Sequence, residues 1–102
     1  MKMMTKEIES RFQKLGRQDH SEAVVVAKFF CPWNGWTWYA TEFDAENREF
    51  FGLVVGHESE LGSFSLDELE AVRGPMGLRI ERDLHWSETP MSAVRQIAAS
   101  TL

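Results

Sequence analysis

Residues 36–43 constrain the fold most, because their side chains alternate strictly, as they would along a β-strand. One face of that strand would carry Trp36, Trp38, Ala40 and Glu42. The other face would carry Thr37, Tyr39, Thr41 and Phe43. Both faces would hold aromatic side chains, which is more than a strand with one buried face requires. The segment therefore predicts either a strand buried on both sides or a strand with an aromatic binding face.

Two further segments have the composition of strands. Residues 23–31 and 49–55 are rich in β-branched and aromatic side chains, with apolar residues on both faces. Pro32 ends the first segment, and Asn34-Gly35 is the dipeptide most typical of a tight hairpin turn. We therefore expect an antiparallel meander of three strands, to which residues 61–64 could add a short fourth.

Segments with a helical pattern precede and follow the predicted strands in the sequence. Residues 5–15 are amphipathic, with Thr5 able to cap the first turn. Ser65 and Glu68 form a capping box before a short middle helix, and Pro90 occupies a tolerated first position of a last helix. Residues 76–86 alternate loosely and suggest a turn and an edge segment. The sequence predicts an α+β fold with three helices packed on an antiparallel sheet of three to four strands.

The bulk composition narrows the functional classes. The chain has 102 residues, which we expect to form a single domain over residues 1–102. Its net charge of −5 argues against an extended phosphate-binding groove, so direct nucleic-acid binding is not expected. The single cysteine, Cys31, excludes an intrachain disulfide and is interpreted as a small buried residue. No apolar run approaches the length of a membrane span, so we expect a cytoplasmic protein that does not enter a membrane.

The segment after the third strand gathers possible metal ligands. His57, Glu58 and Glu60, joined in space by Glu42 or His85, could hold a divalent cation for a carboxylate–histidine enzyme. Their spacing matches no established zinc motif, so an exposed polar loop is the favoured interpretation. No nucleophile elbow, phosphate loop or dinucleotide fingerprint occurs in the chain. We therefore expect no enzymatic activity, no metal and no cofactor.

Residues 73–83 are dense in charge and in glycine and proline. Arg73, Arg79 and Arg82 could grip a carboxylate or phosphate through their planar guanidinium groups. Carboxylates that could pair with them locally lie in the same stretch: Glu70, Glu81 and Asp83. Local ion pairing that fixes an irregular loop is the favoured interpretation, and an interaction surface is the alternative.

The aromatic strand face could instead stack the bases of a single nucleic-acid strand or bind a small ligand. Base stacking of this kind also needs a basic track. Lys28, Arg48 and Arg11 are too few and too scattered to form one. Aromatic side chains packed under the helices are the favoured interpretation, although an edge strand beside an apolar face could also pair with a second copy and form a homodimer.

A family resemblance is carried, in order along the chain, by residues 28–30, 36–42, 51–56, 60–70, 72–78 and 80–84. Through these segments the chain resembles a bacterial family called domain of unknown function 2958. The resemblance implies a context on plasmids, phages and integrated elements. It implies no activity or cofactor, and no functional residues can be carried over.

Our leading hypothesis is a non-enzymatic accessory protein of a mobile genetic element that binds a protein partner. In its concrete version the partner is a host defence effector, such as a restriction or CRISPR complex, whose basic site an acidic domain would occupy. Aromatic side chains would anchor the partner and charged ones would steer it. The residues expected to do so are Trp36, Trp38, Glu42, Glu58, Glu60, Arg73, Glu81, Arg82 and Asp83.

Overall fold

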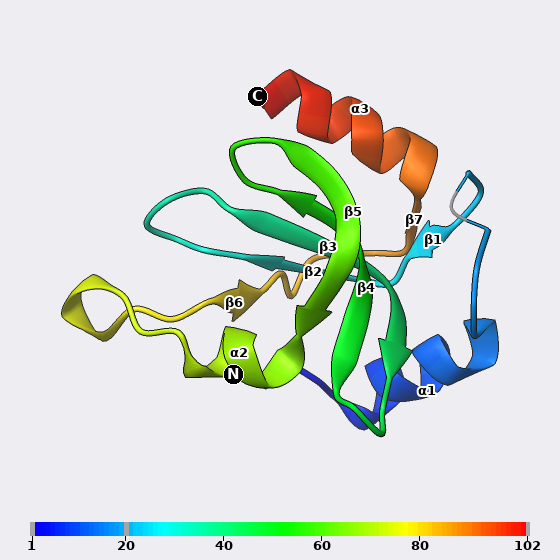
Figure 1. The fold of residues 1–102 in the computed structure, drawn as a ribbon, viewed down its shortest axis with the longest axis horizontal. Coiled ribbons are helices and arrows are strands. Elements are labelled where there is room, and N and C mark those ends of the chain that lie inside the picture. Colours follow the sequence, from blue (N-terminus) through cyan, green and yellow to red (C-terminus); the bar gives the residue numbers. More distant parts are fainter. Residues whose placement is uncertain (1, 20, 102) are drawn as a thin grey trace.

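A computed structural model describes residues 2–19 and 21–101 and has an α+β architecture (Figure 1). Five strands form one antiparallel sheet in the order β5-β4-β3-β2-β6. They are β2 (Ala27–Phe30), β3 (Thr37–Asp44), β4 (Glu49–Val55), β5 (Ser59–Ser65) and β6 (Glu81–Arg82). The expected meander is confirmed. The sheet is larger than expected because β5 is a full-length strand and β6 pairs with β2.

The remaining elements surround this sheet. The helices are α1 (Lys6–Leu15), α2 (Leu66–Ala71) and α3 (Met91–Thr101), and η1 (Pro75–Gly77) is a short 3-10 turn. Two short strands, β1 (Val24–Val25) and β7 (Thr89–Pro90), pair with each other outside the main sheet. Within the described residues, no helix is long and apolar enough to span a membrane.

The sheet is covered on both faces. On one face, Phe12 of α1 and Leu66 and Leu69 of α2 pack with the buried strand residues Phe29 and Phe50. On the other face, three buried residues of α3 pack against the strand side chains: Met91, Val94 and Ala98. Figure 1 shows α3 on one side of the sheet and α1 and α2 on the other. Of the two alternatives left open by the sequence, burial on both sides therefore holds for the middle of β3.

A β-bulge interrupts β3 and changes its facing pattern. Ala40 lies opposite Gly52, but the next pair joins Glu42 to Phe51, so Thr41 is the extra residue. Thr41 is buried, and its hydroxyl donates to the carbonyl of Phe51 at 3.1 Å. Beyond the bulge the strand has turned over, so the strict alternation predicted for residues 36–43 is wrong after Ala40.

The bulge requires a glycine on the neighbouring strand, and it changes the face on which Phe43 lies. A Cβ atom at Gly52 would lie 1.9 Å from the carbonyl oxygen of Tyr39, so only glycine allows the two backbones to approach this closely. Phe43, expected on the face of Tyr39, instead lies with the opposite core, where its ring centroid is 6.0 Å from that of Phe12. The bulge thus adds Phe43 to the core under α1.

The helix starts follow the predicted capping residues. The hydroxyl of Thr5 accepts from the N–H of Ile8 at 3.1 Å, and that of Ser65 accepts from the N–H of Glu68 at 3.1 Å. Pro90, however, does not begin α3. It lies opposite Val24 in the small sheet, and α3 begins one residue later.

Two predicted strand features also differ in detail. The segment 23–31 is not continuous, because β1 turns away to pair with β7 before β2 joins the main sheet. The hairpin between β2 and β3 is a longer loop than a two-residue turn, because the N–H of Gly35 donates to the carbonyl of Cys31. Of the Asn34-Gly35 pair, Gly35 alone has a positive φ, so the primed turn expected there is wrong.

Candidate functional site

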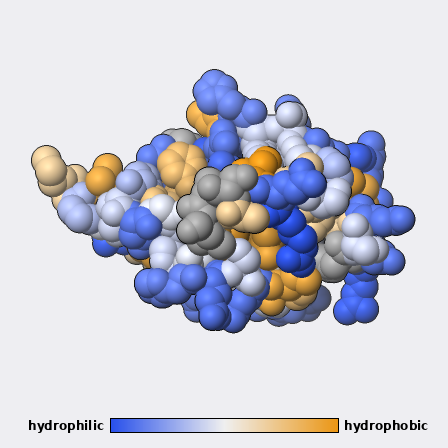
Figure 2. All heavy atoms as spheres, turned by 90° about the horizontal axis from the view of Figure 1, so that it is seen from above, coloured by the Kyte–Doolittle hydropathy of each residue, from blue (hydrophilic) through white to orange (hydrophobic). Residues whose placement is uncertain are grey.

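Residues 72–79, called here the projecting loop, extend away from the sheet between α2 and β6. In Figure 1 the loop is the yellow segment at the far left, and Figure 2 shows the same projection with hydrophobic atoms at its end. Met76 is completely exposed, Leu78 is 42% exposed and Val72 is 37% exposed. Large apolar side chains so open to water are typical of interaction sites when they gather in one place.

Backbone hydrogen bonds hold the projecting loop in shape. The N–H of Gly74 donates to the carbonyl of Leu78 at 2.7 Å, and the N–H of Leu78 donates to the carbonyl of Pro75 at 3.0 Å. Met76 between them has a φ of 57°, a left-handed conformation that is uncommon for residues other than glycine. Met76 is therefore presented by a local backbone structure and not by core packing.

Trp33 supports the base of this loop. A Cβ atom at Gly74 would lie 2.7 Å from the Trp33 ring, so the indole packs directly on the glycine backbone. Trp33 is partly buried and also contacts the core under α1 and α2. The hairpin between β2 and β3 thus connects the projecting loop to the sheet.

Two arginines at the base of the projecting loop donate hydrogen bonds to backbone carbonyl oxygens and leave their positive charges without a paired carboxylate among the described residues. The guanidinium of Arg73 donates to the carbonyl oxygens of Glu70 and Val72 at 2.8 and 3.1 Å, and that of Arg79 donates to the same Glu70 carbonyl. Within the described part of the chain, no carboxylate forms an ion pair with Arg73 or Arg79. The loop base therefore carries two positive charges.

Two of the carboxylates expected to pair with the arginines of residues 73–83 pair with other residues. The Glu70 carboxylate pairs with Arg48 at 3.1 Å, and Asp83 pairs with Lys28 at 3.7 Å. The predicted pairing of Arg73 and Arg79 with those carboxylates is wrong, because the carboxylates pair with Arg48 in the turn before β4 and with Lys28 in β2. Arg82 donates through Nε to the carbonyl of Lys2 at 3.0 Å and so fixes the N-terminal segment.

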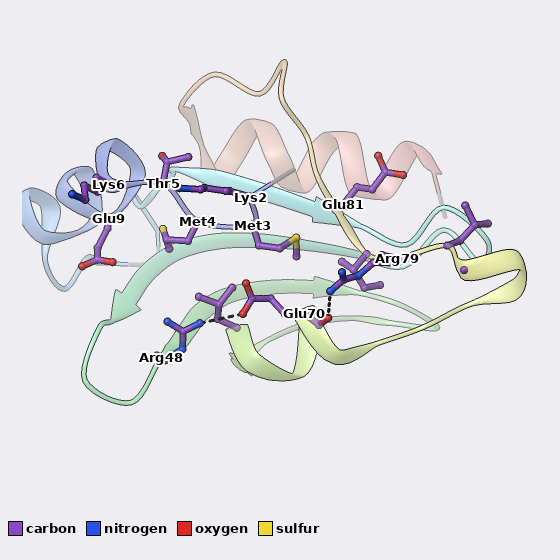
Figure 3. Close-up of a pocket in the computed structure, with 14 residues that line it drawn as sticks. Lys2, Met3, Met4, Thr5, Lys6, Glu9, Arg48, Glu70, Arg79 and Glu81 are labelled. Atoms are coloured by element: carbon purple, nitrogen blue, oxygen red, sulfur yellow. Dashed lines mark hydrogen bonds and ion pairs between the residues drawn. The ribbon is translucent and has the colours of Figure 1, made fainter.

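A groove of about 900 Å³ adjoins the projecting loop (Figure 3). Its apolar lining is formed by Met3, Met4, Leu66, Leu78 and Ile80. Its charged lining is formed by Lys2, Lys6, Glu9, Arg48, Glu70, Arg79 and Glu81. Because Gly77, Leu78 and Arg79 line the groove, it is continuous with the projecting loop.

The charges along one side of the groove are ordered. Figure 3 shows Glu70 between Arg48 and Arg79, joined to each by a dashed line. Arg48 also donates to Asp67 at 2.7 Å, and this hydrogen bond and the charge of Asp67 raise the pKa of Arg48. The groove was not predicted, because the N-terminal methionines that line it carry no motif and reach it only through the fold.

The aromatic strand face is only partly open. Trp36 and Trp38 are half-buried and contact the core under α1 and α2, with their ring centroids 6.3 Å apart. Trp36 packs flat on Gly56, where a Cβ atom would lie 2.4 Å from the ring, and its ring meets His57 at right angles. These contacts agree with the interpretation that the tryptophans are packed under the helices.

The predicted acidic residues fall into separate places. Glu58 and Glu60 are exposed, and Glu60 lies in the same cross-strand row as Trp38, with Val54 between them. Glu42 accepts from the N–H of Gln18 at 3.1 Å and fixes the loop after α1. Among the described residues, no three His, Cys, Asp or Glu side chains are grouped so that they could hold a metal ion.

Of the nine predicted site residues, the structure therefore brings Trp36 and Trp38 together, and Glu60 lies two strands from Trp38 in the same cross-strand row. Arg73 lies at the projecting loop. Glu81 and Arg82 are adjacent in β6 and point to opposite faces, because neighbouring strand residues alternate. The predicted residues do not form one site. Met76, Leu78 and Trp33 were missed, and the Gly-Pro-Met-Gly sequence was the only signal for them.

Fold and surface together define a small α+β protein with a five-stranded antiparallel sheet and a projecting apolar loop. A family model described as protein of unknown function DUF2958 matches residues 2–101. The chain belongs to this family, as the resemblance in its sequence indicated. Searches of curated proteins and of solved structures found no match.

Proposed function

We propose that this protein acts by binding a protein partner, with the projecting loop as its anchor and without catalysing a reaction. The observation that carries the proposal is Met76, a fully exposed apolar side chain on a backbone fixed by two hydrogen bonds. A side chain presented on a preordered loop loses less conformational entropy on binding than one on a flexible segment. Such anchors commonly supply most of the energy of an interface.

The charge beside the anchor indicates which surface it would meet. Arg73 and Arg79 leave the loop base positive, although the whole chain carries a net charge of −5. The partner surface around the loop is therefore expected to be acidic, with an apolar pocket that accepts Met76. A basic site on a host defence effector, the partner considered from the sequence, would have to meet the acidic residues Glu58 and Glu60 instead.

Affinity capture from a lysate of the source organism, with captured proteins identified by mass spectrometry, tests the proposal. The wild type should recover a stoichiometric partner, and Met76→Asp should lose it, because a carboxylate cannot enter an apolar pocket without a large desolvation cost. Leu84→Asp is the matched control, because Leu84 is also an exposed apolar residue but lies beyond β6. Equal recovery by Met76→Asp and the wild type would contradict the proposal.

The charge of the partner surface is tested separately. Replacing both Arg73 and Arg79 by Glu should weaken capture, most strongly at low ionic strength. If the same change strengthens capture, the partner surface is basic and the host-effector version is favoured. Circular dichroism of each variant shows whether the fold is kept.

A further inference from the structure

The two edges of the sheet differ in how they are protected. The edge strand β6 has two residues, Glu81 and Arg82, and both are charged. The edge strand β5 has seven residues, and Glu60 is its single charged residue. Natural sheets usually protect an edge by making it short, by placing charges or proline on it, or by inserting a bulge. By these criteria β6 is protected, but β5 is not.

β5 is also regular and uncovered. Its register with β4 runs without a shift from Ser59 opposite Val55 to Ser65 opposite Glu49. No strand in the described part of the chain pairs with its outer edge, because β5 ends the strand order. In Figure 1, β5 lies at the front of the sheet with no helix drawn across it. The strand can therefore accept another strand along its length.

We propose that β5 pairs antiparallel with β5 of a second copy of this chain, around a two-fold axis at Gly62. In this register Gly62 lies opposite Gly62 of the other copy. The other pairs are Leu61 with Ser63, Glu60 with Phe64, and Ser59 with Ser65. The pairing continues one sheet across two copies and follows the isologous symmetry that most homodimers use.

The side chains of β5 fit a copy of the same strand. Glu60 lies opposite Phe64, so no two like charges face each other. Leu61, which is 41% exposed, would face the small residue Ser63 and lie diagonal to Leu61 of the other copy, so each could cover the other. The space beside Gly62 is open, since a Cβ atom there would have no other atom within 4 Å, so the strands can approach closely at the axis.

This inference is independent of the proposed function. It rests on β5 and not on the projecting loop, and a monomer could bind a partner through Met76 as well as a dimer could. A dimer would carry two projecting loops.

Light scattering during size-exclusion chromatography, repeated over a concentration series up to the millimolar range, measures the association directly. The wild type should change from monomer to dimer as its concentration rises. Leu61→Lys should weaken the dimer about tenfold or more, because an edge lysine opposes strand pairing. Leu84→Lys adds the same charge at another exposed leucine and should leave the dimer unchanged. A wild type that stays monomeric throughout, or a dimer unaffected by Leu61→Lys, would overturn the proposal.

Disulfide trapping tests the register. Gly62→Cys, made together with Cys31→Ala to remove the buried thiol, places two cysteines opposite each other at the axis. Mild oxidation should convert this variant to a covalent dimer much faster than it converts Leu84→Cys in the same background. Equal rates for the two variants would mean random collision and would overturn the proposed register.

Discussion

Phe50 and Met76 are both large apolar residues, yet Phe50 is 1% exposed and Met76 is completely exposed. Phe50 is the centre of an aromatic cluster, defined here as Phe12, Phe29, Phe43, Phe50 and Phe64, with ring centroids 4.8 to 5.8 Å from that of Phe50. Met76 lies on a loop closed by its own backbone hydrogen bonds. The first residue is held by tertiary packing, and the second is presented by local structure.

The contrast separates a residue that stabilises the fold from the residue on which the proposed function depends. A residue packed by four rings contributes to the free energy of unfolding, because its removal leaves a cavity. A residue that projects into water in an uncommon backbone conformation contributes little or even lowers stability. The function proposed above gives such a residue a role that stability does not.

The largest effect on stability is expected for Phe50→Ala. Deleting a buried phenylalanine costs about 3–5 kcal/mol of unfolding free energy, because both its transfer energy and the contacts around the cavity are lost. Urea denaturation followed by tryptophan fluorescence would measure the change. Leu78→Ala is the control on the projecting loop and should change stability far less, since Leu78 is already 42% exposed. Similar losses for the two variants would remove the distinction between the regions.

A smaller effect is expected for Ser65→Ala, at the start of the helix that leads into the projecting loop. Its hydroxyl caps α2 by accepting from the N–H of Glu68, and loss of such a cap costs about 1 kcal/mol. Ser63→Ala, two residues earlier in β5, is the matched control, because the Ser63 side chain is exposed and caps no helix. Thermal unfolding of both variants compares them. If Ser63→Ala costs as much, the cap is not the cause.

The sequence predicts the aromatic cluster better than it predicts the projecting loop. Hydrophobic patterning identified α1 and β4, and the spacing of Ser65 and Glu68 identified the start of α2, because each depends on residues close in sequence. The bulge at Thr41 escaped prediction, because it is set by the approach of Gly52 from a neighbouring strand. Phe43 was consequently placed on the wrong face.

The partners of the charged side chains in the projecting loop were predicted wrongly for a similar reason. Local pairing of Arg73 and Arg79 with Glu70 looked sufficient in the sequence. In the fold, Arg48 from the turn before β4 takes the Glu70 carboxylate, and the two arginines turn to the Glu70 carbonyl. The groove of Figure 3 likewise depends on residues 2–4 meeting α2 and residues 77–81, which no local pattern encodes.

Phe50→Ala and Ser65→Ala are expected to lower the free energy of unfolding, whereas Met76→Gly is expected to raise it. A left-handed backbone costs a non-glycine residue roughly 1–2 kcal/mol, and glycine avoids this cost while losing about 0.5–1 kcal/mol through its freer unfolded chain. The net change is expected to lie between zero and about 1.5 kcal/mol in favour of the variant. Urea denaturation measures it, and Leu84→Gly, at an exposed position whose φ is not positive, serves as the control. The same Met76→Gly variant should lose partner capture, which a purely structural role of Met76 does not predict.

The smallest effect at neutral pH is expected for ionisation of Tyr39, which packs in the core under α3 and lies outside both the aromatic cluster and the projecting loop. Burial, and then the charge of Asp83, raise the pKa of Tyr39 above its usual value of 10.0. The folded state therefore keeps its proton where the unfolded state loses it. Stability should be unchanged by this group below pH 10.0 and should fall as the pH rises above that value and through the folded-state pKa.

Tyr39 is the single tyrosine of the chain, so tyrosinate absorbance follows this group alone. Its titration should begin above the usual pKa and coincide with the loss of unfolding free energy measured at the same pH values. Tyr39→Phe keeps the ring that packs near Trp86, at a centroid distance of 5.7 Å, and should remove this part of the alkaline instability. A loss of stability that persists fully in Tyr39→Phe would place its origin in a group other than Tyr39.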